Sequence, residues 1–481
     1  MRFLPAVFRW ACGRRSPLVI TALLLAVLMM VISARANARS NLRLPLLPPQ
    51  WCPSRFEAAS AAQRLVPAPA SPAEDAAKQH LPAGSTAAFF ATLSTSAAEL
   101  VAAGGVHLVD SAAMLGEGSL FPRSGGGGVD LLSQYGLETS MIRLLQASPF
   151  LVGSAERAAL HVVPQFATFE VHHCLYALNP IPHARLESCA ANVTRDYLMP
   201  LIRAVQATPA YQRTRGADHV WIFPWDLAWE LFPGVPEALA GNLFWGYTGP
   251  PQNLIPVPVT VRAALDAEAV ERNALQGGHS PAAAAVGLAA AGRQSASACA
   301  DLPPHRFLAS FAGTVWPARV YSRGLRQDLL AAFPEARATE TRVAVIDRHL
   351  EPAEYARLLR DSLFCLSPQG WTPWSQRLYS MISAGCVPVF FDMPGFNVQL
   401  PMPDLLDWDA MSITIPPGRH SEVADILGRI APKDVCEMRS RIAAAAPLLL
   451  WSQSPHTVLL GALHGAWVAV KARAADAAKR L

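Results

Sequence analysis

Short apolar stretches recur along the chain, and each is bounded by residues that favour turns. Five stretches share this pattern: residues 219–225, 305–313, 341–347, 364–368 and 386–391. They are rich in branched and aromatic side chains, which pack well on a pleated surface. Because each stretch is short and flanked by Gly, Pro or Asp, the pattern predicts buried β-strands.

Segments of helical length separate the later stretches. Residues 319–333, 352–362 and 374–384 alternate with them, so the order is strand, helix, strand, helix. This order predicts an α/β fold in which helices cover a parallel sheet. Such sheets bind ligands beyond the carboxyl ends of their strands. A longer helix-like stretch, residues 457–481, ends in a basic cluster that we interpret as a solvated face.

Residues 18–34 form an uncharged apolar run of the length of a short membrane-spanning helix. Four arginines precede the run and three follow it closely, which weakly favours a cytosolic N-terminus. A cleaved signal peptide is the alternative, because residues 36–38 (ANA) resemble a cleavage site. We favour an uncleaved anchor, since the run exceeds a typical signal core. Both alternatives send the rest of the chain into the secretory pathway.

A chain of 481 residues is too long for one ordinary core, so we expect two large domains. Composition suggests these parts: a cytosolic tail (1–17), the anchor (18–34), a Pro/Ala-rich stem (35–85), an N-terminal domain (86–270), a low-complexity linker or insertion (271–300) and a C-terminal domain (301–481). The alanine content of residues 271–300 also fits a short helix.

The composition excludes some classes of protein. A net charge of +4 is mild for this length, and no nucleic-acid-binding motif is present, so we expect no nucleic-acid partner. No cysteine or histidine spacing resembles a zinc site, and we interpret His172 and His173 as helix residues rather than ligands. Asn192 begins an Asn-Val-Thr triplet and is a candidate N-glycosylation site.

One arginine follows a predicted strand in a way that favours anion binding. Residues 364–368 lead into the loop QGWTPW, and Pro373 suits the first turn of the next helix. Ser375 and Arg377 then fall where free backbone N–H groups attract an anion. An Arg at this position can hold a phosphate with two parallel hydrogen bonds. The alternative is a salt bridge between domains.

A second group of arginines follows the strand at residues 305–313. On the predicted helix 319–333, Arg319, Arg323 and Arg326 are four and three residues apart, so they are expected to share one face. An exposed basic stripe is the alternative. Two arginine-bearing helix starts at the ligand-binding edge of one sheet favour a phosphate site.

Residues 307–447 resemble the exostosin family, glycosyltransferase family 47, and within it the plant xylan xylosyltransferase-like branch. The segments FCLSPQGWTPWSQRL, AGCVPVFF and YSRGLRQ carry this resemblance, and YQRTRGADHVWIFPWD resembles a landmark further upstream. The resemblance implies a GT-B fold, in which two Rossmann-like domains face each other across a cleft. It also implies inverting transfer from a donor held by the C-terminal domain, with no metal in the site.

The resemblance also implies roles for particular residues. Arg323, Arg326 and Arg377 are expected to bind the donor diphosphate, Gly370 and Ser375 to shape the loop, and Cys365 and Cys386 to form a disulfide. Asp226 is the candidate general base for the acceptor hydroxyl. Asp392, at the carboxyl end of a predicted strand, is expected to contact donor or acceptor. Asp407-Trp408-Asp409 mimics a metal motif of another fold, and we expect a structural turn there.

Two positions depart from the family pattern. Ser380 stands where the family has an acidic residue that is expected to contact the donor. Trp225 stands where a His precedes the family's Asp. These departures point to an altered donor choice or to lost catalysis.

We therefore predict a type II Golgi membrane glycosyltransferase. It transfers a sugar from a UDP-sugar to a polysaccharide or glycoprotein glycan and requires no cofactor. One alternative is a catalytically inactive exostosin-like subunit that binds or stabilises an active glycosyltransferase. A lumenal glycan-binding protein that uses the same cleft is a third class.

Overall fold

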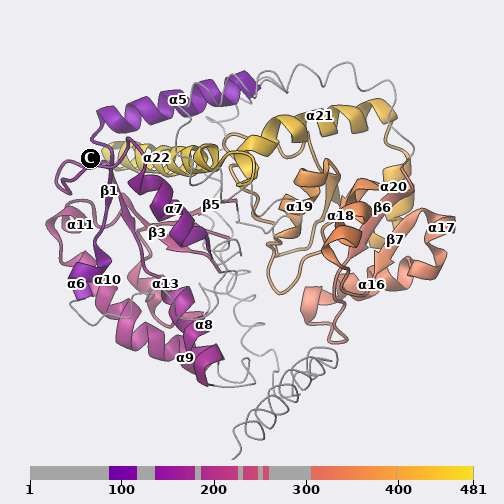
Figure 1. The fold of residues 1–481 in the computed structure, drawn as a ribbon, viewed down its shortest axis with the longest axis horizontal. Helices are drawn as coiled ribbons and strands as arrows, with labels where there is room; N and C mark the ends of the chain where they lie inside the picture. Colours follow the sequence, from indigo (N-terminus) through magenta and orange to yellow (C-terminus); the bar gives the residue numbers. More distant parts are fainter. Residues whose placement is uncertain are drawn as a thin grey trace, which may run out of the picture. The chain divides into compact units, whose positions relative to one another are not determined.

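The computed structural model describes residues 86–115, 136–178, 186–225, 231–247, 253–258, 305–396 and 398–479 (Figure 1). Contacts divide the chain into two units, Met1–Ala58 and Ala59–Leu481, and every described residue belongs to the second. The predicted anchor, stem and linker lie outside the described residues. Within the described part, no helix has the length and apolar character needed to cross a membrane.

The N-terminal sheet is entirely parallel, and its strands lie in sequence order. They are β1 (Val106–Leu108), β2 (Leu160–Val163), β3 (His219–Phe223), β4 (Leu243–Gly246) and β5 (Leu254–Pro256). Successive side chains of a strand point to opposite faces. On β3, Val220 and Ile222 therefore enter one hydrophobic core, while Trp221 and Phe223 enter another. Cores on both faces explain why β3 is apolar along most of its length.

Helices supply the partners of these two cores. They are α5 (Thr86–Ala102), α6 (Ser111–Leu115), α7 (Leu137–Gln146), α8 (Ala167–Leu178), α9 (Leu186–Val193), α10 (Met199–Gln206), α11 (Pro209–Thr214) and α13 (Val235–Ala238). A π-helical turn, Thr194–Leu198, joins α9 to α10. A disulfide between Cys174 and Cys189 links α8 to α9.

The C-terminal sheet is also parallel, but its strand order reverses. Its strands are β6 (Phe307–Ala312), β7 (Val343–Ile346), β8 (Ser362–Leu366), β9 (Val387–Phe391) and β10 (Ile413–Ile415), in the spatial order β10-β9-β8-β6-β7. The chain moves outward from β6 to β7 and then returns to the other side of β6. Ligands of open α/β sheets bind beyond the carboxyl ends of the strands at such a reversal. The prediction of an α/β fold with parallel sheets is confirmed.

The helices after β6 are α16 (Leu325–Ala332), α17 (Ala338–Thr341), α18 (Pro352–Arg360), α19 (Arg377–Ala384), α20 (Val423–Gly428), α21 (Pro432–Leu449) and α22 (Pro455–Lys479). Short 3₁₀ turns lie at Tyr321–Gly324, Glu335–Arg337 and His420–Glu422. Although α22 comes from the end of the predicted C-terminal domain, it packs against α5, α7 and β5 (Figure 1). Trp245 of β4 donates a hydrogen bond from Nε1 to the carbonyl of Ala462, 3.2 Å away.

Two helices begin later than predicted. The segment 319–333 is not one helix, because Ser322, Arg323 and Gly324 have φ angles of 52°, 49° and 83°. The backbone N–H of Ser322 donates to the carbonyl of Gly370, which takes this turn out of the helical hydrogen-bond pattern. The helix predicted from residue 374 begins at Arg377, and the Trp374 ring stacks on that of Tyr247, with centroids 4.5 Å apart.

Candidate functional site

A cavity of about 620 Å³ lies at the carboxyl ends of β6 and β7, against α18 and the start of α19. Its lining residues are Ala312, Gly313, Thr314, Trp316, Tyr321, Arg326, Arg348, His349, Leu350, Pro352, Tyr355, Ala356, Leu359, Arg360, Ser375, Gln376, Arg377, Ser380, Ser383 and Ala384. Four of these described lining residues are arginines and none is acidic. The cavity therefore combines positive charge with an apolar wall.

Arg377 is the first residue of α19, and its guanidinium lies at the end of β6. Nη2 donates to the carbonyl of Ala312 over 3.0 Å, and the group sits 4.6 Å above the ring of Phe311. Its Nε is buried and has no hydrogen-bond partner among the described residues. An unpaired buried donor beside a cavity is costly, so an acceptor on a ligand would satisfy it.

Arg326 is almost fully buried, at 6% exposure, and holds the loop that follows β8. Nε donates to the carbonyl of Gln369, Nη2 to that of Pro368 and Nη1 to that of Thr314. Burial and the neighbouring charge of Arg377 lower the pKa of Arg326 to about 10, so it remains cationic at neutral pH. The two guanidinium groups repel each other, which favours an anion beside them.

Ser375 lines the cavity, but the other remaining predicted donor residues lie outside its lining. Arg323 donates from Nη1 to the carbonyl of Pro394 over 3.1 Å and lies over the ring of Phe396. Asp392 is exposed, and Gly370 accepts the hydrogen bond from Ser322. The structure therefore brings Arg326, Ser375 and Arg377 together at the cavity and leaves Arg323, Gly370 and Asp392 outside its lining.

The expectation that Arg319, Arg323 and Arg326 share one helix face is wrong. The left-handed turn at residues 322–324 separates the first two from α16, which begins at Leu325. Arg319 instead forms a two-pronged ion pair with Asp328 at 2.8 Å, on the surface. Of the three, only Arg326 lines the cavity.

A disulfide joins Cys365 of β8 to Cys386, just before β9, with Cα atoms 5.9 Å apart. This is the pair that the resemblance implied. Ser380 lines the cavity on α19. The turn at Asp407 is present, because a carboxylate oxygen of Asp407 accepts the backbone N–H of Ala410.

Other predicted residues lie in the N-terminal part. Asp226 lies outside the described residues. Trp225 is buried against His172, with ring centroids 5.1 Å apart, and His172 hydrogen-bonds the Thr168 carbonyl. Asn192 is exposed on α9. Accessibility is a requirement for glycosylation.

Among the lining residues that sequence reasoning missed are Arg348, His349, Tyr355 and Arg360. Arg348 and His349 come soon after a stretch correctly predicted as a strand, and this position was an available signal. Their convergence with α19 depends on the strand order, which puts β7 and β8 on opposite sides of β6. That order cannot be read from local patterns.

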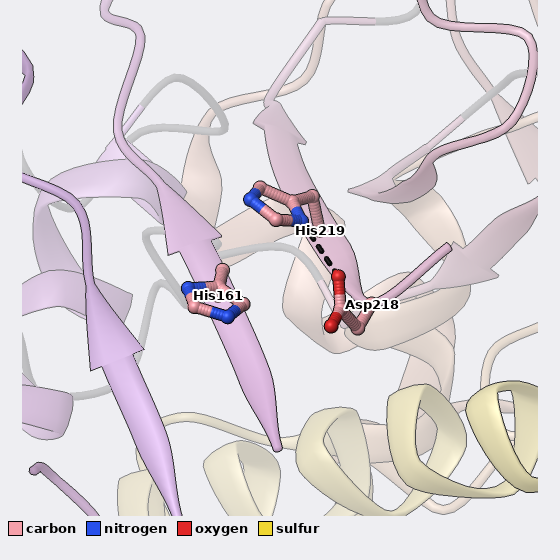
Figure 2. Close-up of side chains that lie close together, drawn as sticks. All are labelled: His161, Asp218 and His219. Atoms are coloured by element: carbon pink, nitrogen blue, oxygen red, sulfur yellow. Dashed lines mark hydrogen bonds and ion pairs between the residues drawn. The ribbon is translucent and has the colours of Figure 1, made fainter. Parts of the chain in front are cut away.

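A second polar cluster lies in the N-terminal sheet, where His161, Asp218 and His219 are all buried (Figure 2). Nδ1 of His219 and Oδ1 of Asp218 are 2.7 Å apart, and the hydroxyl of Thr214 donates to the same oxygen. Burial, together with the charge of His219, lowers the pKa of His161 to about 4. Burial would raise the pKa of Asp218, but its hydrogen bonds from His219 and Thr214 outweigh that effect and lower it.

The reversal of strand order and the cationic cavity beside it define an α/β domain suited to an anionic ligand. Residues 293–430 match the family model described as the Exostosin GT47 domain. These residues thus resemble the exostosin GT47 domain, and the predicted resemblance is confirmed.

Curated relatives with similar sequences are plant proteins named as glycosyltransferases. The probable glucuronoxylan glucuronosyltransferase IRX7 of Arabidopsis thaliana is 37% identical over 79 residues, 16% of this chain and 17% of the relative. The probable beta-1,4-xylosyltransferase IRX10 of the same plant is 31% identical over 93 residues, 19% of this chain and 22% of the relative. A probable glucuronosyltransferase of Oryza sativa subsp. japonica is 23% identical over 325 residues, 66% of this chain and 68% of the relative.

The alignments with the higher sequence identities are short. In the first three of them the chain spans only 17%, 24% and 21% of the relatives' length. The activity of those proteins is therefore only proposed for this chain.

Proposed function

We propose that this chain is a glycosyltransferase that transfers a sugar from a UDP-sugar to a polysaccharide or glycoprotein glycan, with inversion at the anomeric carbon. One observation supports the proposal above all: the cavity in the region that matches the exostosin GT47 domain is lined by four arginines and by no aspartate or glutamate. Guanidinium groups bind phosphate oxygens through paired, charge-assisted hydrogen bonds. The relatives named as glucuronosyl- and xylosyltransferases support the same class of reaction.

In this proposal Arg377 is the principal contact of the diphosphate. Its unpartnered Nε is available, whereas Arg326 is committed to three backbone carbonyls and keeps the loop in place. The apolar wall formed by Leu350, Pro352 and Tyr355 suits the flat base of a nucleotide. The cationic groups stabilise the departing diphosphate, so the donor site needs no metal cofactor.

The acceptor side completes the proposed reaction. The two sheets form the two domains of a GT-B enzyme, and Asp226, next to the buried Trp225, removes the proton from the acceptor hydroxyl. The enzyme is a single-pass type II protein of the Golgi membrane, anchored through residues 18–34, with its catalytic part in the lumen and a glycan on Asn192. These assignments rest on the sequence.

A second candidate is an inactive subunit that binds or stabilises an active glycosyltransferase. Ser380 favours it, because this cavity residue replaces the expected donor-contacting carboxylate. Such a subunit would keep the nucleotide site but lack turnover.

Binding of UDP by the full-length chain in detergent, measured by calorimetry, tests the proposal. We expect binding by the wild type and a loss of about 10–100-fold in affinity for Arg377→Ala, which removes charge-assisted hydrogen bonds. Arg337→Ala is the matched control, because Arg337 is exposed and paired with Glu340. This control should bind UDP like the wild type.

Turnover then separates the two candidates. Hydrolysis or transfer with any of a panel of UDP-sugars supports the enzyme, and UDP binding without turnover of any of them supports the subunit. A folded chain that binds no UDP would overturn both proposals for the cavity.

A further inference from the structure

Strand register brings three metal-ligating side chains together in the N-terminal sheet. His161 of β2 is paired in register with His219 of β3, and Asp218 directly precedes β3. The two imidazole rings stack with centroids 4.4 Å apart. One ligand atom from each of the three residues lies within 4.8 Å of the other two. The sequence did not point to this cluster, because 57 or more positions separate His161 from the others.

All three side chains are removed from solvent, with exposures of 1% for His161, 6% for Asp218 and 1% for His219. Figure 2 shows edges of both rings turned toward the Asp218 carboxylate. Nδ1 of His219 forms a hydrogen bond with Oδ1 of Asp218, 2.7 Å away. Nε2 of His161, in contrast, is buried and has no hydrogen-bond partner among the described residues. Buried polar atoms of this kind are rare, and a bound ion or water is one established reason for them.

The donor set has a definite chemical preference. Two imidazole nitrogens and one carboxylate oxygen suit divalent first-row transition ions and above all zinc, which takes His and Asp ligands at about 2.0–2.2 Å. Calcium and magnesium prefer sites made of oxygen ligands. We propose that His161, Asp218 and His219 bind one zinc-class divalent ion that links β2 to β3.

Binding requires a small rearrangement. Ligand atoms around a tetrahedral zinc ion lie roughly 3.3–3.5 Å apart, given the bond lengths of such sites. The ligand atoms now lie within 4.8 Å of one another, and the ring planes are 12° from parallel. Rotation of the side chains moves the in-plane lone pairs toward one point, while paired backbone holds both histidines in register. Metal binding therefore disrupts the ring stack.

The position of this site indicates a structural rather than a catalytic ion. His219 is the first residue of β3, so the cluster lies at the amino end of that parallel strand. Ligands that react in such folds bind at the carboxyl ends. A structural ion contributes its binding free energy to folding, which gives a readout independent of sugar transfer.

The test uses the full-length chain, freed of any histidine tag and of metal by dialysis against a chelator. Zinc binding is measured by equilibrium dialysis with metal analysis, and stability by thermal unfolding with and without zinc chloride. We expect about one zinc per chain and a rise of several degrees in the unfolding temperature, because the ion binds only the folded state. Cobalt substitution should give the visible absorption of a tetrahedral site.

His161→Phe is the informative variant, since a Phe ring preserves the stack on His219 but offers no ligand atom. It should fold and lose at least about tenfold in zinc affinity together with most of the thermal shift. Asp218→Asn provides a second reading if His161→Phe does not fold. His173→Ala is the control, because His173 is exposed on α8 and should leave binding unchanged.

Two results would overturn the proposal. One is a zinc content near zero in the folded wild type at micromolar free zinc. The other is equal zinc affinity of the wild type and the ligand variants, which would place the ion elsewhere in the chain.

Discussion

At the scale of single residues, Gly313 determines where the guanidinium of Arg377 can lie. A Cβ on Gly313 would be 2.6 Å from Nη2 of Arg377 and 3.3 Å from the Phe311 ring. Gly313→Ala should therefore displace the guanidinium from the Ala312 carbonyl and lower UDP affinity by about tenfold, the effect of one charge-assisted hydrogen bond. Calorimetric titration with UDP measures this change.

The matched control is Gly428→Ala. A Cβ there meets nothing within 4 Å, and Gly428 ends α20. If Gly313→Ala binds UDP as well as this control does, the Arg377 guanidinium does not need its observed position.

Site residues whose position depends on neighbouring residues in the sequence could be predicted, and those whose position depends on distant contacts could not. Arg377 follows a strand and a proline-containing loop, and this order alone suggested an anion near the helix start. Arg326 was predicted to bind the donor diphosphate from its helix spacing and from the family resemblance, but its guanidinium donates to the carbonyls of residues 314, 368 and 369. Those partners come from two separate loops, and no sequence pattern specifies their approach.

At the scale of secondary-structure elements, Glu138 connects the start of α7 to the carboxyl end of β2. The side chain is fully buried and accepts backbone hydrogen bonds from Gln165 and Phe166, the closest at 2.6 Å. Phe166 has a φ of 48°, so these bonds hold a strained turn before α8. Burial raises the pKa of Glu138 to about 8, although the two backbone donors oppose the rise.

This shift predicts a pH dependence of folding. The folded chain holds the Glu138 proton more strongly than the unfolded chain, whose Glu titrates near 4.5. The stabilising contribution is therefore complete below pH 4.5 and is lost as the pH rises toward 8. The free energy of unfolding should fall by up to about 1.4 kcal/mol per pH unit in this window.

Urea unfolding at several pH values measures that slope, and Glu138→Gln should reduce it because glutamine does not titrate, whereas Glu170, whose pKa burial raises to about 7, still contributes. Glu187→Gln on the exposed surface of α9 is the control and should keep the wild-type slope. Identical slopes for wild type and Glu138→Gln would show that Glu138 does not titrate in this range.

The five strands that were predicted lie close to observed strands, and α18 begins at Pro352 as predicted, but α16 and α19 begin later than predicted. The apolar stretches at residues 219–225 and 386–391 correspond to β3 and β9 within two residues, because burial on both faces requires a continuous apolar run. The start of α16 depends on a hydrogen bond from Ser322 to Gly370, and α19 begins after Trp374 stacks on Tyr247. Such distant contacts override local helix preference.

At the scale of the whole described molecule, α22 attaches to the N-terminal sheet through Arg473. Its guanidinium donates to the carbonyls of Ala217, Gly241 and Asn242 and to Oδ1 of Asn253, the last over 2.7 Å. Arg473→Met keeps much of the aliphatic stem but leaves these acceptors unpaired. The free energy of unfolding should fall by about 2–4 kcal/mol, since several hydrogen bonds to a charged group are lost together.

Chemical denaturation of the full-length chain measures this loss. Lys479→Met on the same helix is the control and should change stability by less than about 0.5 kcal/mol, because its pair with Asp476 is exposed. An unchanged midpoint for Arg473→Met would mean that apolar packing alone holds α22 in place.

The attachment of α22 also constrains the order of events during synthesis. All strands of the N-terminal sheet leave the ribosome before α22 does, because α22 follows them in the chain. Until it arrives, the apolar face that carries Trp245 lacks the helix that covers it. Nascent chains with uncovered apolar surface are prone to aggregation. We therefore expect the N-terminal half of this protein to be most prone to aggregation until α22 has emerged from the ribosome.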